Sequence, residues 1–228
     1  MYHSVSWQGY RDALCVSPER FKAQMLFLDR LKLRGVSMRE LCLAMNRGNA
    51  KGLVGLTFDD GYQDFLDAAL PTLENLGFSA TVFVVASRLG EENDWEHGGA
   101  TRPRMRLLGA DGVREIFGRG VEVGSHTMTH PRLSGLGSEA LAREIDESRR
   151  VLGEVLGAPV EGFCYPYGDL DADAVRAVRA GGYTYACATK ARVEHSAHDW
   201  PRAFVGEGDS PPRLGLKLIA QGLLPGHR

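Results

Sequence analysis

Apolar residues recur along the chain in two rhythms, one with helical spacing and one in short continuous runs. Ser17 and Pro18 supply an N-cap and a first-turn proline, and apolar residues follow every three or four positions up to Gly35. This predicts a first helix that ends at Gly35. A capping-box pattern over 37–40 predicts a second helix.

After residue 50, short apolar runs alternate with amphipathic segments. The segment 80–86 is apolar at nearly every position, which predicts a strand buried on both faces. Pro71 should bend or restart its helix, and polar residues 87–106 indicate a long surface loop. The predicted strands are 53–58, 80–86, 121–124, 162–165, 183–188 and 203–205, and the predicted helices are 62–76, 111–117, 138–156, 171–180 and 212–223.

This alternation, repeated about five times, indicates parallel strands joined by helical crossovers. Either a (β/α) barrel or a doubly wound open sheet fits the pattern. In both folds the chemistry lies at the carboxyl ends of the strands. We find no repeat or linker, so residues 1–228 are expected to form one α/β domain.

Composition and charge give no sign of a nucleic-acid-binding protein, a membrane protein or a cysteine zinc site. A net charge of −2 gives no reason to expect a nucleic-acid partner. No apolar run is long enough for a transmembrane segment. The first residues do not resemble a secretory signal, which predicts a cytoplasmic protein, or a secreted one if a leader is missing. The four cysteines form no CxxC pair and are expected to be free thiols rather than zinc ligands.

Polar clusters follow three of the predicted strands directly. These clusters are Asp59-Asp60-Gly61, Ser125-His126 and Tyr165-Pro166-Tyr167-Gly168. Because the carboxyl ends of parallel strands meet at one edge, the three clusters should lie close together.

The spacing of His126 and His130 can place two imidazoles on one side of a helical turn. Two imidazoles and one carboxylate form a common open catalytic metal set, which suits zinc best and also iron, cobalt or manganese. Asp59 and Asp60 could divide the roles of base and ligand. The alternatives are two unrelated loop histidines, and an Asx-turn that leads into the helix at Tyr62.

Together these motifs resemble the polysaccharide deacetylases, the NodB-homology group of carbohydrate esterase family 4. The resemblance runs from about residue 50 to 190 and rests on Leu56–Gly61, Ser125–His130 and Tyr165–Gly168. It implies a distorted (β/α) barrel of the NodB-homology type. The activity it implies is hydrolysis of an N-acetyl group from a carbohydrate, with release of acetate.

The resemblance also implies a role for each matching residue. Asp59 would be the general base, and Asp60, His126 and His130 would hold one divalent metal ion. Zn²⁺ is the first choice, with Co²⁺, Ni²⁺, Fe²⁺ or Mn²⁺ as alternatives. A backbone N–H near Tyr167 would help to stabilise the oxyanion.

Three departures from the family pattern matter. Cys164 stands where the third motif usually has an arginine, so we expect the thiol to pack under the site and Arg202 to supply the cation. The C-terminal Leu-x-His motif is missing, and the last histidine is His227. Tyr2-His3 resembles the branch that deacetylates poly-β-1,6-linked N-acetylglucosamine, which makes His3 the candidate catalytic acid.

Substrate contacts are assigned to Pro166, Tyr167, Trp200 and Arg202. The sequence around Trp200 loosely matches an Asp-x-x-Asp-Trp motif that lines the groove in the family. The remaining histidines have no motif context and are expected in loops; they are His97, His195 and His198. Two other functions stay open, an O-acetyl esterase acting on an acetylated glycan and a non-catalytic sugar-binding module.

Overall fold

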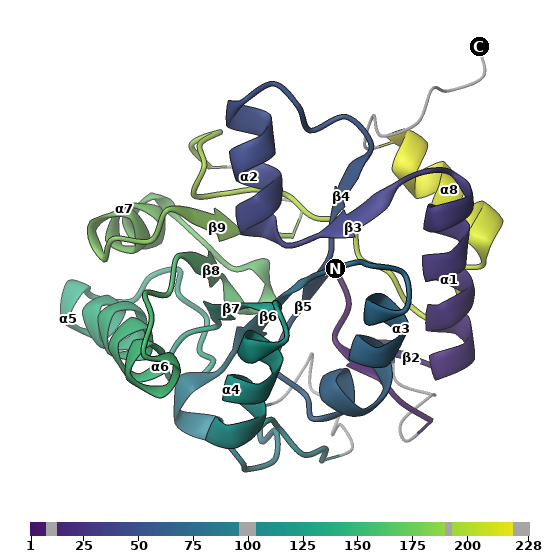
Figure 1. Cartoon of the computed structure of the whole chain (residues 1–228). Helices are drawn as coiled ribbons and strands as arrows, with labels where there is room; N and C mark the ends of the chain where they lie inside the picture. Colours follow the sequence, from purple (N-terminus) through teal and green to yellow (C-terminus); the bar gives the residue numbers. More distant parts are fainter. Residues whose placement is uncertain (8–12, 96–103, 190–192, 221–228) are drawn as a thin grey trace.

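The computed structural model describes residues 1–7, 13–95, 104–189 and 193–220 (Figure 1). Its centre is a five-stranded parallel sheet in the order β5-β6-β7-β8-β9. Each strand therefore lies beside its neighbour in sequence, as expected for successive β-α crossovers. The strands are β5 (Thr57–Phe58), β6 (Thr81–Val84), β7 (Glu122–Ser125), β8 (Gly162–Cys164) and β9 (Tyr185–Cys187).

Irregular chain fills the gap between the two edges of this sheet. Trp200 bridges to β9, the Val205 N–H donates to the Met1 carbonyl, and Tyr2 bridges to β5. The sheet is thus completed into a distorted barrel, and the open-sheet alternative is wrong. The predicted strand 203–205 is also wrong, because this segment makes only isolated ladder bonds. A separate pair of short parallel strands is formed by β1 (Ser4–Val5) and β2 (Cys15–Val16).

Helices surround the strands, as Figure 1 shows. No helix in the described ranges has the length and apolar character that a membrane crossing requires. Most predicted helices form with small shifts of their ends. They are α1 (Pro18–Arg30), α2 (Met38–Asn46), α3 (Leu70–Glu74), α4 (Ala110–Gly118), α5 (Ser138–Ala142), α6 (Ser148–Leu156), α7 (Ala172–Ala180) and α8 (Pro211–Ala220).

The first helix ends at Arg30 and not at Gly35. Gly35 lies in β3 (Arg34–Val36), which pairs with β4 (Leu53–Gly55). A Cβ on Gly35 would lie 2.3 Å from Leu56 Cδ1, so this glycine permits close packing and does not stop a helix. The predicted strand 53–58 divides at Leu56, whose N–H donates to one sheet and whose carbonyl accepts from the other.

Two helices contain π-helical turns that the sequence did not predict. Phe65–Ala69 forms one directly before α3, where Pro71 restarts the helix as expected. Arg143–Glu147 forms the other, between α5 and α6, so the predicted helix 138–156 is continuous but not regular. Such turns often occur near functional sites.

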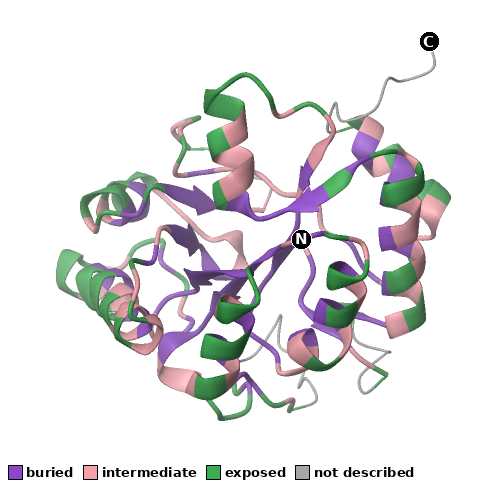
Figure 2. Ribbon diagram, viewed as in Figure 1, coloured by how far each residue is buried: buried purple, intermediate pink, exposed green. Residues whose placement is uncertain are grey.

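Buried residues gather on the strands and on the inward faces of the helices (Figure 2). All four residues of β6 are buried, which confirms that strand's prediction. Phe58 packs against three aromatic rings at centroid distances of 4.7–5.7 Å, those of Tyr2, Phe21 and Phe65. Truncating Phe58 to alanine would cost about 3–5 kcal/mol. The same packing fixes the backbone immediately before Asp59.

Candidate active site

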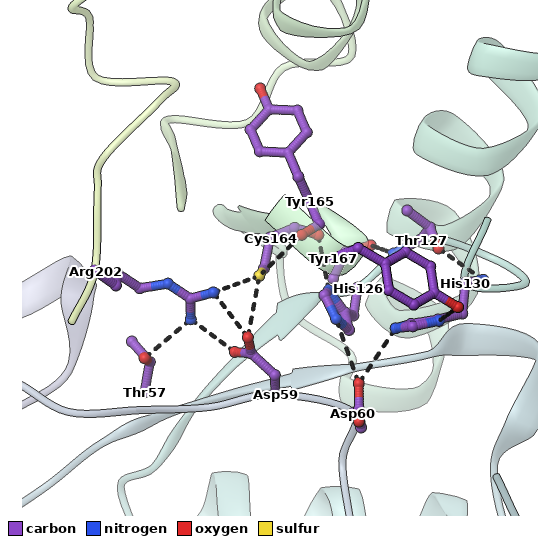
Figure 3. A network of polar contacts seen from close by, with 11 residues as sticks. Thr57, Asp59, Asp60, His126, Thr127, His130, Cys164, Tyr165, Tyr167 and Arg202 are labelled. Carbon is purple, nitrogen blue, oxygen red and sulfur yellow. Dashed lines mark hydrogen bonds and ion pairs between the residues drawn. The ribbon is translucent and has the colours of Figure 1, made fainter. Parts of the chain in front are cut away.

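The polar residues that follow β5, β7 and β8 converge on one cleft (Figure 3). Asp59 and Asp60 leave β5, His126 leaves β7, and Tyr165 follows β8. All are buried. Parallel strand topology alone predicted this meeting of three separate motifs.

The two adjacent aspartates point in different directions because the backbone reverses between them. Asp60 has φ of 73° and Gly61 has φ of 77°, in the left-handed region that glycine adopts without strain. The Asp59 carboxylate faces Arg202, while the Asp60 carboxylate faces the two histidines. This division places two acidic groups in one site with different partners.

Asp60 Oδ1 lies 3.4 Å from His126 Nε2 and 3.3 Å from His130 Nε2. The Nδ1 of His126 lies 2.8 Å from the carbonyl oxygen of Cys164, which can only accept a hydrogen bond. Nδ1 therefore carries a proton and Nε2 is turned toward Asp60. His130 Nδ1 lies 3.2 Å from the Tyr167 hydroxyl.

The histidines lie on a loop, so the predicted helical turn is wrong. Thr127 has φ of 70° and His130 has φ of 67°, values that no α-helix contains. The His130 N–H donates to Thr127 Oγ1 at 2.9 Å, which closes the loop locally. The imidazoles meet because of this left-handed geometry.

These three side chains fit a divalent metal ion. Their ligand atoms all lie within 4.8 Å of one another. Both carboxylate oxygens of Asp60 are buried and have no hydrogen-bond partner in the described part of the chain. Burial opposes ionisation of Asp60, but His126 and His130 outweigh it and hold its pKa well below the ordinary value. A buried, ionised carboxylate with open lone pairs beside two imidazoles is a typical catalytic metal set.

Asp59 is held by Arg202 through two parallel hydrogen bonds of 2.6 and 2.7 Å. Burial raises the pKa of Asp59, but the Arg202 guanidinium outweighs this effect and lowers the pKa to about 2. The side chains of both partners are only 5–6% exposed. Arg202 is therefore engaged with Asp59 and does not line the cleft, which argues against its assignment as a substrate contact.

Cys164 lies under this ion pair. Its Sγ is 2.9 Å from Arg202 Nη2 and 3.6 Å from Asp59 Oδ2. Burial raises the pKa of the thiol, so it is neutral. All four cysteines lie in the described residues and none is in a disulfide, as predicted.

His3 reaches the cleft from the N-terminal segment. The imidazole is 8% exposed, and its Nδ1 has no hydrogen-bond partner among the residues described. Burial lowers the pKa of His3. The side chain lines the same cleft as Asp59 and Asp60, so it is placed where a proton donor could act.

The cleft has a volume of about 180 Å³, and its lining includes Tyr167, Gly168 and Thr189. Pro166 precedes Tyr167 but does not line the cleft. Trp200 is not brought to the cleft either, since it packs against a separate group that includes Met38 and Cys187.

A tryptophan that the sequence analysis missed lies at the metal set. Trp95 stacks on His130 at a centroid distance of 4.4 Å and an interplanar angle of 26°. The signal was present, because Asp94-Trp95 matches the end of the groove motif that was assigned to Trp200. His198 Nε2 bonds to a backbone carbonyl and does not reach the cleft. His97 and His227 lie outside the described residues.

Comparisons with known proteins agree with this geometry. The polysaccharide deacetylase family model matches residues 46–186. A poly-β-1,6-N-acetyl-D-glucosamine N-deacetylase of Staphylococcus epidermidis is 24% identical over 180 residues, which cover 75% of this chain and 60% of that protein. The chain spans less than two thirds of the length of the first curated relatives it matches, 63% and 24% for two of them.

Solved structures share the fold over nearly the whole chain. IcaB from Ammonifex degensii is 25% identical with a TM-score of 0.78, and the match covers 94% of this chain and 93% of that one. The Streptococcus pyogenes deacetylase PplD, solved with acetate, is 24% identical with a TM-score of 0.80, covering 99% and 96%.

Proposed function

Because the chain belongs to the polysaccharide deacetylase family, we propose that it hydrolyses the N-acetyl group of a carbohydrate and releases acetate. The observation that carries this proposal is the convergence of Asp60, His126 and His130 beside a second, separately held carboxylate. A purely sugar-binding module would have no need of a buried ion pair that keeps Asp59 ionised.

We assign the metal site to Asp60, His126 and His130, with Zn²⁺ as the first choice. A bound divalent ion would polarise the acetamide carbonyl and make water more acidic at neutral pH. The Nδ1–H of His126 is held by the Cys164 carbonyl, which orients the ring as in other histidine metal sites. Trp95 covers one face of His130 and shields that ring from water.

Asp59 is the proposed general base. It accepts a proton from the attacking water while the water oxygen bonds to the acetamide carbon. Arg202 keeps the carboxylate ionised and fixes its plane, so its role is to position the base. The backbone N–H near Tyr167 is the proposed donor to the oxyanion.

His3 is the proposed general acid. The carbon–nitrogen bond breaks only if the leaving amine gains a proton, because a free amide anion is a very poor leaving group. Donation from His3 gives the amine and acetate. Its position in the lining of the same cleft as the metal ligands supports this role.

The substrate we favour is a glycan or glycan precursor that contains N-acetylglucosamine. The cleft volume of about 180 Å³ suits a single sugar residue and not a long buried oligosaccharide. The Staphylococcus epidermidis relative is a deacetylase of poly-β-1,6-N-acetyl-D-glucosamine, which supports the same class. A biosynthetic substrate in the cytoplasm stays our first prediction, with a secreted polymer as the alternative.

An O-acetyl ester is the second candidate substrate. An alkoxide leaves more easily than an amide nitrogen, so ester cleavage depends less on the acid. His3→Ala should therefore abolish release from an N-acetylated sugar and spare release from an O-acetylated one. Equal loss on both substrates would argue against His3 as the acid.

The direct test is acetate release from N-acetylglucosamine oligomers with β-1,4 and β-1,6 linkages. Purified protein would be assayed with Zn²⁺, after chelation, and as Asp59→Asn. We expect metal-dependent release that Asp59→Asn abolishes while it still binds zinc. If folded, zinc-loaded protein released no acetate from N- or O-acetylated glycans, the catalytic proposal would be wrong and a binding module favoured.

A further inference from the structure

The loop that carries His126 and His130 rests on the helix that follows it in sequence. The contact is made at the π-helical turn Arg143–Glu147, between α5 and α6. Glu144 lies in this turn and is half-buried. It belongs to none of the family motifs that the sequence analysis singled out.

The Glu144 carboxylate accepts three hydrogen bonds from the loop. Oε2 accepts the backbone N–H groups of Met128 and Thr129 at 2.9 and 2.8 Å. Oε1 accepts the Thr129 hydroxyl at 2.7 Å. One side chain thus satisfies two consecutive backbone donors between the two histidines.

A second contact from the same helix supports the beginning of the loop. Ser148 follows the π turn, and its hydroxyl bonds to the Glu144 and Ile145 carbonyls. Ser125 Oγ donates to Ser148 Oγ at 2.8 Å and accepts the Thr127 N–H at 3.2 Å. The helix therefore holds the loop at two points.

The opposite side of the loop is fixed by the chain after β6. The N–H groups of Ala86 and Ser87 donate to the carbonyls of Thr127 and Met128, both at 3.0 Å. Backbone on one side and Glu144 on the other therefore determine the loop path.

These contacts are needed because the backbone of the loop is strained. Thr127 and His130 are non-glycine residues with positive φ, a strained backbone conformation that persists only when surrounding contacts impose it. We propose that Glu144 is a positioning residue that imposes this geometry and so sets the metal affinity of the site. Without it, two backbone donors lose their acceptor, and the loop can relax so that His130 moves away from Asp60.

The inference rests on the proposed metal set but not on any substrate. Zn²⁺ affinity of the apoprotein, measured by competition with a chromophoric chelator, is the primary readout. The visible spectrum of the Co²⁺ form reports ligand geometry independently. The variants are Glu144→Ala and Glu144→Gln, with Glu147→Ala and Glu147→Gln as matched controls. Glu147 is exposed and lies in the same π turn.

We expect Glu144→Ala to weaken Zn²⁺ binding about 10–100-fold, the usual effect of removing a group that orients metal ligands. Glu144→Gln should weaken it less, because the amide oxygen can still accept one or both backbone N–H groups. The Co²⁺ spectrum should change in both variants. The Glu147 controls should stay within about twofold of the wild type, as expected for surface changes.

The inference would be overturned if both Glu144 variants bound Zn²⁺ as tightly as their Glu147 controls and their Co²⁺ spectra were unchanged. If Glu144→Ala does not fold, the Glu144→Gln and Glu147→Gln pair gives the same comparison. Wild-type protein is titrated alongside. Failure of the wild type to bind Zn²⁺ would instead reject the proposed metal site itself.

Discussion

Arg202 and Asp59 form a buried ion pair whose removal should be costly and pH-dependent. Replacing Arg202 by Met keeps much of the side-chain volume but leaves the Asp59 carboxylate without its bidentate partner. Breaking one side of a buried pair typically costs about 3–5 kcal/mol. We expect Arg202→Met to lower the free energy of unfolding by that amount at pH 8.

The pH dependence follows from the pKa of Asp59. Arg202 overcomes burial and lowers this pKa from 3.8 to about 2, which stabilises the fold by about 2 kcal/mol. That contribution is present above pH 3.8 and is lost as pH falls through about 2. In Arg202→Met burial is still opposed by His3 and His126 but no longer by Arg202, so the pKa of Asp59 should rise. The variant's deficit should therefore be smaller at pH 5 than at pH 8.

A double-mutant cycle measures the interaction free energy between Arg202 and Asp59 separately from their other contacts. Arg202 also donates to Thr57 and to the Ala188 carbonyl, and those losses occur whether or not Asp59 is ionised. The measurement is urea unfolding with EDTA, on Arg202→Met, Asp59→Asn and the double variant. Coupling of about 2 kcal/mol or more is expected.

The control is Arg150→Met, whose side chain is 62% exposed and pairs only with Glu154 in the part of the chain that the structure describes. It should change stability by no more than about 0.5 kcal/mol. Additive effects of Arg202→Met and Asp59→Asn, with coupling below about 0.5 kcal/mol, would refute the reasoning. Arg202 would then not be the group that holds the base.

Two further predictions concern metal and proton binding. A Zn²⁺ concentration 100-fold above Kd should stabilise the fold by about 2.7 kcal/mol and raise Tm by about 5–11 °C. Asp60→Ala should lose this shift in a thermal scan, and a shift retained in Asp60→Ala would move the metal site elsewhere. Burial raises the pKa of Asp64 to about 6, so its stabilising contribution is complete below pH 3.8 and is lost as pH rises through 6. The free energy of unfolding of Asp64→Asn, measured in urea, should therefore rise by up to about 3 kcal/mol relative to that of the wild type between pH 4 and pH 8. If the difference between variant and wild type does not change with pH, the pKa of Asp64 is not raised by burial.

Local patterns in the sequence predicted the order of the strands and helices and most of the residues of the site. Apolar runs marked the parallel strands, and the polar residues after them had to share one edge. That reasoning placed Asp59, Asp60 and His126 together before any contact was known. Capping residues also fixed the start of α1 and α2, because an N-cap bonds to a backbone N–H only three residues away.

Details that depend on distant chain could not be predicted in the same way. The division of the strand at Leu56 reflects hydrogen bonding to two different sheets. The left-handed loop before His130 is imposed by contacts from other elements, since local preference alone favours right-handed backbone.

Closure of the barrel determines which distant side chains meet at the site. Arg202 reaches Asp59 across 143 positions of sequence, and Trp95 stacks on His130 while the similar Trp200 packs elsewhere. Sequence spacing gives the direction of a side chain only relative to its own helix or strand. Which distant side chain fills a given place is decided by packing in three dimensions. The sequence predicts Arg202 as the replacement cation, but its bidentate contact with Asp59 follows only from the tertiary structure.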